Sequence, residues 1–98
     1  MPRQKLTDGE IERALVELAP WAIRGNKLHR DFEFGDFAQA IGFITIAAIH
    51  IEKRNHHPEW FNVYKRVSVD LTTHDAGGIT SNDIELARLL NSIASKFA

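Results

Sequence analysis

Three segments of the chain carry apolar residues at the three- and four-residue spacing of an amphipathic helix. The first begins at Thr7 and Glu10, which have the spacing of a capping box, and ends before Pro20. The last follows an N-cap at Thr80 or Ser81 and continues nearly to the carboxyl terminus. The apolar positions of these two helices are Ile11, Ala14, Leu15 and Leu18 in the first and Ile84, Leu86, Ala87, Leu90, Ile93, Ala94 and Phe97 in the last. Each helix therefore has one face to bury.

The middle helical segment, from an N-cap at Asp36 to about Asn55, is apolar on two sides. One stripe consists of Phe37, Ile41, Ile44, Ala48 and Ile51, and a second line consists of Phe43, Ile46, Ala47 and Ile49. A surface helix of a monomer would carry charges along the second line. This helix therefore either lies centrally in its own core or packs one face on a sheet and the other on a second subunit.

Two further segments have the period of β-hairpins. In residues 21–34, Gly25 and Asn26 can supply the positive φ angles of a two-residue turn. The apolar face of the strand after this turn consists of Leu28, Phe32 and Phe34. Arg30 lies on the same face, so the alternation is imperfect.

The second hairpin comprises residues 60–64 and 67–74, with Lys65 and Arg66 in its turn. Phe61 and Val63 alternate with Asn62 and Tyr64, and Val67, Val69 and Leu71 alternate with Ser68 and Asp70. The element order is thus α-β-β-α-β-β-α, with a short turn inside each strand pair. This order predicts an α+β fold in which helices pack on one face of a four-stranded antiparallel sheet. We expect residues 1–98 to form a single domain.

Charge and composition exclude several classes of protein. The chain has 12 basic and 13 acidic residues and a formal net charge of -1, which disfavours direct binding to nucleic acid. It has no cysteine, and therefore no disulfide or thiolate metal site. Residues 41–51 form the longest apolar stretch, about half of the roughly 20 residues that cross a bilayer. With no signal peptide at the amino terminus, we expect a soluble, cytoplasmic protein that does not bind membranes.

Candidate chemistry concentrates in the segment EKRNHHPEWFNVY, residues 52–64. Because Pro58 disfavours helical backbone at His57, the two adjacent histidines should leave the helix in an extended segment and point in opposite directions. Glu52 lies one helical turn before His56, where a carboxylate can stabilise the imidazolium and prepare a general acid. The simpler reading is a surface Glu-His pair at a helix end.

A third histidine, His74, should end the fourth strand and be brought toward the histidine pair by the hairpin. There it would lie beside Trp60 and a glycine-rich loop, a better candidate site than any of these histidines alone. His29 is expected on the solvent face of its strand, and His50 at a subunit contact. A three-histidine metal site completed by Glu52 or Asp75 is a further hypothesis, which the diverging pair disfavours.

The site residues together resemble the pterin-4a-carbinolamine dehydratase family. The resemblance rests on Glu52-Lys53, Asn55 to Trp60, Asn62 to Tyr64, Thr73 to Asp75, Gly78 and Asp83, and it covers nearly the whole chain. It implies loss of water from a 4a-hydroxytetrahydropterin, giving quinonoid dihydropterin, in the recycling of tetrahydrobiopterin. It also implies a homodimer or homotetramer and no metal or organic cofactor.

Individual roles are carried over from the family to the matching positions. His56 and His74 become the acid/base pair, His57 a binding or orienting residue, and Glu52 the residue that tunes His56. The implied substrate-binding residues are His56, His57, Pro58, Trp60, Thr73, His74, Asp75 and Ala76. Asn55 departs from the pattern, since some members have Asp there, and a carboxylate role at that position is not carried over.

Some family members also act as the dimerisation cofactor of a homeodomain transcription factor. The resemblance therefore leaves a second hypothesis, a protein-interaction module or transcriptional coactivator that uses its helical surface. The apolar line of Phe43, Ile46 and Ile49 is the sequence feature that would carry such binding, or self-association alone.

Overall fold

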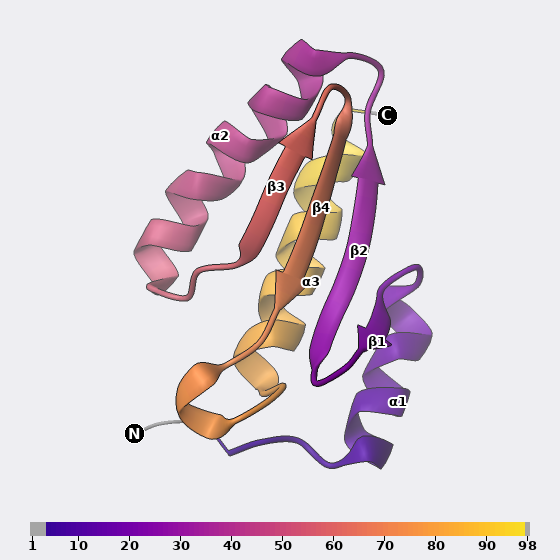
Figure 1. Ribbon diagram of the computed structural model, residues 1–98, viewed down its shortest axis with the longest axis vertical. Helices are drawn as coiled ribbons and strands as arrows, with labels where there is room; N and C mark the ends of the chain where they lie inside the picture. Colours follow the sequence, from indigo (N-terminus) through magenta and orange to yellow (C-terminus); the bar gives the residue numbers. More distant parts are fainter. Residues whose placement is uncertain (1–3, 98) are drawn as a thin grey trace.

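The computed structural model describes residues 4–97 and has the predicted order of helices and strands (Figure 1). The elements are α1 Asp8–Leu18, β1 Ala22–Arg24, β2 Lys27–Glu33, α2 Phe37–Arg54, β3 Glu59–Val63, β4 Arg66–Leu71, a short 3-10 helix η1 His74–Ala76, and α3 Ser81–Ser95. The strands form one antiparallel sheet in the order β1-β2-β4-β3. The predicted α+β fold is therefore confirmed.

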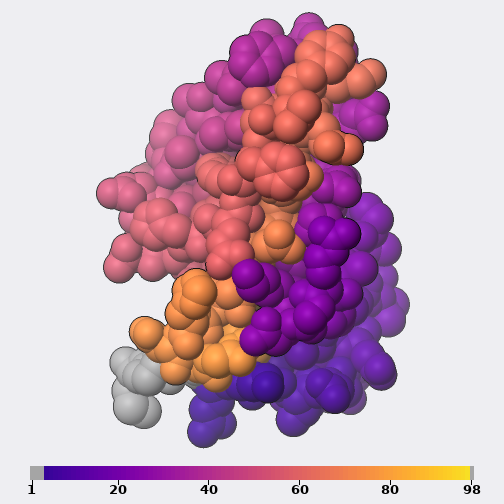
Figure 2. Space-filling model, in the orientation of Figure 1, coloured from indigo at the N-terminus to yellow at the C-terminus, as the bar shows by residue number. Residues whose placement is uncertain are grey.

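The helices cover one face of the sheet and leave the other open. In Figure 1 the strands lie in front of α3, and Figure 2 shows the same open side, with β3 and β4 at the surface. Cross-strand partners place Leu28 opposite Leu71 and Phe32 opposite Val67 on the covered face. The largest fully buried apolar side chains are Phe32, Phe43, Leu18, Leu28, Leu71, Leu86, Leu90, Val67 and Val69. The core therefore lies between this face and the three long helices.

The helix starts follow the predicted caps. Thr7 and Glu10 form a capping box at α1, and the Asp36 side chain accepts a hydrogen bond from the backbone of Gln39 at α2. At α3 the cap is Thr80, one of the two predicted candidates. These caps satisfy amide groups that a helix leaves unpaired in its first turn.

The predicted burial of α2 was partly wrong. The buried residues of this helix are Ala40, Phe43, Ala47 and Ile51. Phe37 and Ile41, expected on the core stripe, are 51% and 39% exposed, whereas Phe43, expected on the outer line, is fully buried. Both sides of α2 are apolar, so periodicity alone could not decide which side faces the sheet. Ile46 and Ile49 remain on the outside, as expected.

The second hairpin also differs from the prediction in its register. Its turn is formed by Tyr64 and Lys65, one residue earlier than expected, and Tyr64 adopts the left-handed conformation with a φ of 53°. The Asn62 side chain donates to the carbonyl oxygens of Tyr64 and Arg66 at 3.0 and 2.9 Å and so closes the turn. At the other end, β4 stops at Leu71, three residues before His74.

Within residues 4–97 there is no helix that combines the length and the hydrophobicity needed to cross a membrane.

Candidate active site

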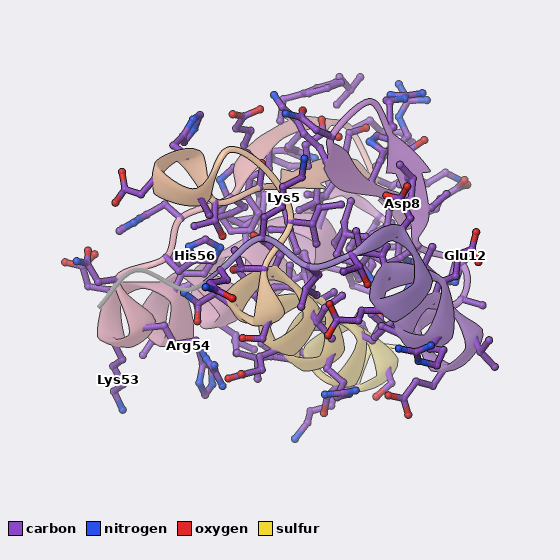
Figure 3. All side chains as sticks on the ribbon, turned by 90° about the horizontal axis from the view of Figure 1, so that it is seen from below. Lys5, Asp8, Glu12, Lys53, Arg54 and His56 are labelled. Carbon is purple, nitrogen blue, oxygen red and sulfur yellow. The ribbon has the colours of Figure 1, made fainter. Side chains whose placement is uncertain are left out.

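The end of α2 separates the two adjacent histidines. Asn55 caps the helix in the left-handed conformation, with a φ of 53°, and its backbone N–H donates to the carbonyl oxygen of Ile51 at 2.9 Å. Pro58 then disfavours helical backbone at His57, the residue that precedes it. As a result His56, labelled in Figure 3, turns toward the start of α3. His57 instead contacts Glu52 on the last turns of α2.

His56 is held by a buried carboxylate from α3. Its Nε2 lies 2.6 Å from Oδ1 of Asp83, and the Asp83 side chain is fully buried. The other carboxylate oxygen, Oδ2, accepts the Thr73 hydroxyl at 2.8 Å and the Thr80 backbone N–H at 2.9 Å. Asp83 thus connects the end of α2, the loop after β4 and the first turn of α3.

The direction of the hydrogen bonds follows from the chemistry of the groups. An ionised carboxylate only accepts, so Nε2 of His56 carries a proton and donates it to Asp83. The Thr73 hydroxyl gives its proton to Asp83 and therefore accepts from the Thr80 hydroxyl, which lies 2.8 Å away. Asp83 thus fixes the ring by Nε2, and within residues 4–97 no hydrogen bond engages Nδ1 of His56.

The loop that carries His74 is closed on itself. Thr73 and Gly78 pair as an isolated bridge, with the Thr73 N–H donating to the Gly78 carbonyl oxygen at 2.9 Å. Between them the single turn of η1 begins at His74, where the sequence had predicted strand. Gly77 ends this turn with a φ of 75°, a conformation that side chains disfavour. The loop therefore has a defined shape.

His74 projects from this loop toward β3. Its Nε2 lies 3.5 Å from Oε2 of Glu59, and Oε1 of Glu59 lies 2.5 Å from the Lys27 amine. The Lys27 hydrogen bond is the main cause that lowers the pKa of Glu59, and Glu59 in turn raises the pKa of Lys27. Glu59 therefore connects the His74 ring on the loop with Lys27 on β2.

The predicted pairing of Glu52 with His56 is wrong. Oε1 of Glu52 lies 3.4 Å from Nε2 of His57, and both side chains are largely exposed. The left-handed residue Asn55 takes the chain off the helical path, so the one-turn spacing between positions 52 and 56 no longer brings them together. The carboxylate that holds His56 is Asp83 and not Glu52.

The three histidines each contact a different carboxylate and differ in exposure. The His56 side chain is 16% exposed, whereas those of His57 and His74 are 57% and 82% exposed. In the described part of the chain no three His, Cys, Asp or Glu side chains gather in a way that could hold a metal ion. The arrangement provides proton donors and acceptors at the edge of the sheet.

Comparison with known proteins identifies the family. The family model described as pterin 4 alpha carbinolamine dehydratase matches residues 4–93. A protein of Solibacter usitatus, named provisionally as a pterin-4-alpha-carbinolamine dehydratase, is 54% identical over 91 residues, which are 93% of this chain and 96% of that protein. The chain belongs to the pterin-4a-carbinolamine dehydratase family.

A second relative and two solved structures also resemble this chain. A Chelativorans protein with the same provisional name is 52% identical over 98 residues, 98% of this chain and all of its own. A crystal structure from Brucella melitensis, titled transcriptional coactivator/pterin dehydratase, has a TM-score of 0.90 at 46% identity and covers 93% and 99% of the two chains. A pterin dehydratase-like protein described as a RuBisCO assembly factor in the alpha-carboxysome has a TM-score of 0.63 at 21% identity, covering 76% and 86%, and shares the fold.

In the structure the predicted site residues fall into three groups. Asp83 connects His56 to Thr73, and Thr73 precedes His74, Asp75 and Ala76 in the closed loop. Glu52 and His57 form a separate, exposed pair. Pro58 and Trp60 lie on the segment between α2 and β3 and at the start of β3, and Trp60 packs partly against the core.

Sequence reasoning missed two carboxylates that hold the histidines, Asp83 and Glu59. Asp83 belongs to the family pattern and has capping-box spacing to Thr80, which is a local signal. Its contact with His56, 27 positions away, arises only when α3 packs beside the end of α2. His29, expected in solvent, is only 13% exposed, because Asp70 and Asp31 flank its ring at 2.9 and 3.3 Å.

Proposed function

We propose that this protein catalyses the dehydration of a 4a-hydroxytetrahydropterin to quinonoid dihydropterin and water, as a hydro-lyase of tetrahydrobiopterin recycling. The observation that carries the proposal is the fixed His56 ring, held by buried Asp83 and tied through Thr73 to the loop that carries His74. Membership of the dehydratase family supports the reaction class.

The reaction requires two proton transfers in opposite directions. The C4a–O bond breaks as the lone pair of the adjacent ring nitrogen forms a C=N bond, and the hydroxyl group leaves as water after it gains a proton. The pterin then loses a proton from nitrogen, so the enzyme gives one proton and takes one. Histidines suit both steps near neutral pH. We assign the pair of roles to His56 and His74.

Asp83 and Glu59 support these roles in different ways. Asp83 fixes Nε2 of His56 as a donor and leaves Nδ1 to exchange protons with the substrate. Glu59, whose pKa is lowered mainly by Lys27, lies 3.5 Å from Nε2 of His74 and orients this ring, and we assign to His74 the donation of a proton to the departing oxygen. The resting state of the site thus contains one candidate base and one candidate acid.

The remaining predicted residues would bind the flat, polar pterin. His57, Asp75 and Ala76 supply hydrogen-bond groups, and Pro58 and Trp60 form an apolar wall. Thr73 supports the binding loop, because its backbone N–H and carbonyl oxygen bond to Gly78 and Ala76. Glu52 orients His57 in this scheme, instead of His56. We propose that the active form is a cytoplasmic homodimer or homotetramer, in which the exposed apolar residues of α2 are covered.

The test is direct. The 4a-hydroxypterin is generated with an aromatic amino acid hydroxylase, and its decay is followed by absorbance with and without this protein. Acceleration that rises in proportion to protein concentration supports the proposal. If the 4a-hydroxypterin decayed at the spontaneous rate at every protein concentration, the proposed dehydratase activity would be refuted.

A second candidate function is binding of a transcription factor, in the sense of a dimerisation cofactor or coactivator. It is favoured by the exposed apolar side chains of α2, among which Phe37 and Ile49 are 51% and 57% exposed. The description of the Brucella melitensis protein as a transcriptional coactivator/pterin dehydratase also favours it. A His56→Ala/His74→Ala variant separates the two functions. Full function of this variant in cells would favour binding, whereas loss of function would favour catalysis.

A further inference from the structure

Arg30 is a half-buried cation without an anionic partner. It lies on the covered face of β2, and its Nη1 donates to Oδ1 of Asn91 at 2.5 Å. The guanidinium carbon lies 4.1 Å from the centre of the Phe32 ring. Among residues 4–97 no carboxylate forms an ion pair with it, and burial lowers the pKa of Arg30. A charge in such a place is costly unless it is paired.

Arg30 lines an open-sided cavity of about 520 Å³. The cavity arises because β1 pairs only with residues 27–29 of β2, so that the rest of this strand edge has no neighbouring strand; Figure 1 shows β1 beside one end of β2. Ala19 and Pro20 flank the cavity on one side, and the last turns of α3 flank it on the other. Its size is within the roughly 300–1,000 Å³ of small-molecule sites.

The side chains of Arg30 and Asn91 present hydrogen-bond donors to this cavity. Oδ1 of Asn91 accepts from both Arg30 and the indole N–H of Trp21, at 2.5 and 2.7 Å, so the Asn91 amide nitrogen is turned away with two N–H groups to give. Nη2 of Arg30 forms no hydrogen bond within the described chain. Phe34 donates its backbone N–H to the carbonyl oxygen of Lys65, in the turn before β4, so by alternation the N–H and the carbonyl group of Glu33 point to the open edge.

The other charges near the cavity do not oppose an anion there. Glu33 pairs across the sheet with Arg66, so its side chain lies on the open face, opposite to Arg30. Its carboxylate lies 3.4 Å from the Lys65 amine. The remaining walls are aromatic and consist of Phe32, Phe34 and Phe97.

We propose that this cavity binds a small carboxylate with an aromatic body. The guanidinium and the Asn91 amide hold the carboxylate, and the phenylalanine rings pack against the aromatic part. A guanidinium presents parallel N–H groups that match a carboxylate, which is the partner that Arg30 lacks. The site is distinct from the histidine site and does not depend on the proposed dehydratase function.

The experiment is an NMR titration of the full chain with 3-phenylpropionate. The Trp21 indole N–H serves as a built-in reporter, because it shares Oδ1 of Asn91 with Arg30. We expect saturable shifts of this signal and of the Arg30 Nε–H, with a Kd on the order of 1 mM for a ligand of this size. The neutral analogue 3-phenyl-1-propanol and acetate should each bind at least about 10-fold more weakly.

Variants locate the binding. Arg30→Met should weaken binding of 3-phenylpropionate by at least about 10-fold, whereas Arg24→Met, at an exposed position on β1, should leave the Kd unchanged. Ser95→Trp fills the cavity from the exposed end of α3 and should weaken binding while Arg30 stays in place. His74→Ala should leave the Kd of 3-phenylpropionate unchanged.

Three results would overturn the inference. They are the absence of saturable shifts in the wild-type protein, equal affinity for the carboxylate and the alcohol, and a Kd unchanged by Ser95→Trp. If His74→Ala lost binding of 3-phenylpropionate while Ser95→Trp kept it, the ligand would lie at the histidines, and this cavity would also be rejected.

Discussion

Replacing Asp83 by asparagine tests the network around His56 without changing its shape. The introduced amide has one acceptor oxygen. This oxygen must occupy the position of Oδ2, because the Thr80 N–H and the Thr73 hydroxyl both donate there. Its NH₂ group must then face Nε2 of His56, which can accept only if its proton moves to Nδ1. Asp83→Asn should therefore switch the neutral His56 ring from the Nε2–H to the Nδ1–H tautomer.

The magnitude follows from the three contacts of the carboxylate. Hydrogen bonds to charged groups contribute about 1.5–3 kcal/mol and neutral ones about 0.5–1.5 kcal/mol, so three contacts lose about 3 kcal/mol of unfolding free energy. With the free nitrogen now protonated, the rate of carbinolamine dehydration should fall by on the order of 10² or more. Urea unfolding, ¹⁵N NMR of the histidine rings and the decay assay measure the three effects.

Glu10→Gln is the matched control. Glu10 accepts the Thr7 N–H at 2.9 Å in the capping box of α1, the same local arrangement as Asp83 with Thr80, but without a histidine. This variant should keep both the His56 tautomer and the rate. If Asp83→Asn left the Nε2–H tautomer and the rate unchanged, Asp83 would be only a helix cap, and the reasoning about His56 would fail.

Three further changes test other parts of the structure. Phe43→Ala should lower the unfolding free energy by about 3–5 kcal/mol, since Phe43 is fully buried, whereas Ile49→Ala on the outer side of α2 should change it by less than about 1 kcal/mol in the monomer; equal losses in urea unfolding would refute the observed orientation of the helix. Gly77→Ala should cost about 1–2 kcal/mol, because Gly77 has a φ of 75°, and an unchanged melting temperature would contradict the left-handed turn of this loop. The pKa of Asp31 is lowered mainly by the Ser68 hydroxyl, so its stabilisation is present above the unfolded pKa near about 4 and is lost as the pH falls through the folded value. Asp31→Asn should therefore lower the unfolding free energy by under about 1 kcal/mol at neutral pH, and this loss should shrink as the pH falls below the unfolded pKa; a loss of constant size in acid would refute the charge-based cause.

Local pattern was enough to predict the elements and several of their ends. Capping spacing located Thr7 and Asp36, because a cap is a contact between residues a few positions apart. The apolar faces of α2 could not be ranked, since Phe37 and Phe43 are equally apolar and only packing decides which one meets the sheet. The imperfect alternation at Arg30 was visible in the sequence, but the cavity behind it was not.

The sequence indicated which residues to consider for the candidate site, but it did not predict which of them contact one another. The histidines and the loop after β4 could be found from their types and the family resemblance. The partner of His56 could not, because a single left-handed residue, Asn55, breaks the helical spacing from Glu52, and the replacement, Asp83, comes from a helix distant in sequence.

The measurement that tests the central claim most directly is the rate of carbinolamine dehydration by three proteins at equal concentration. The account predicts that the wild-type protein and His50→Ala, which changes an exposed histidine of α2 outside the site, accelerate the decay equally. His56→Ala/His74→Ala should leave the decay at the spontaneous rate. Acceleration by the double variant equal to that of the wild type would contradict the account.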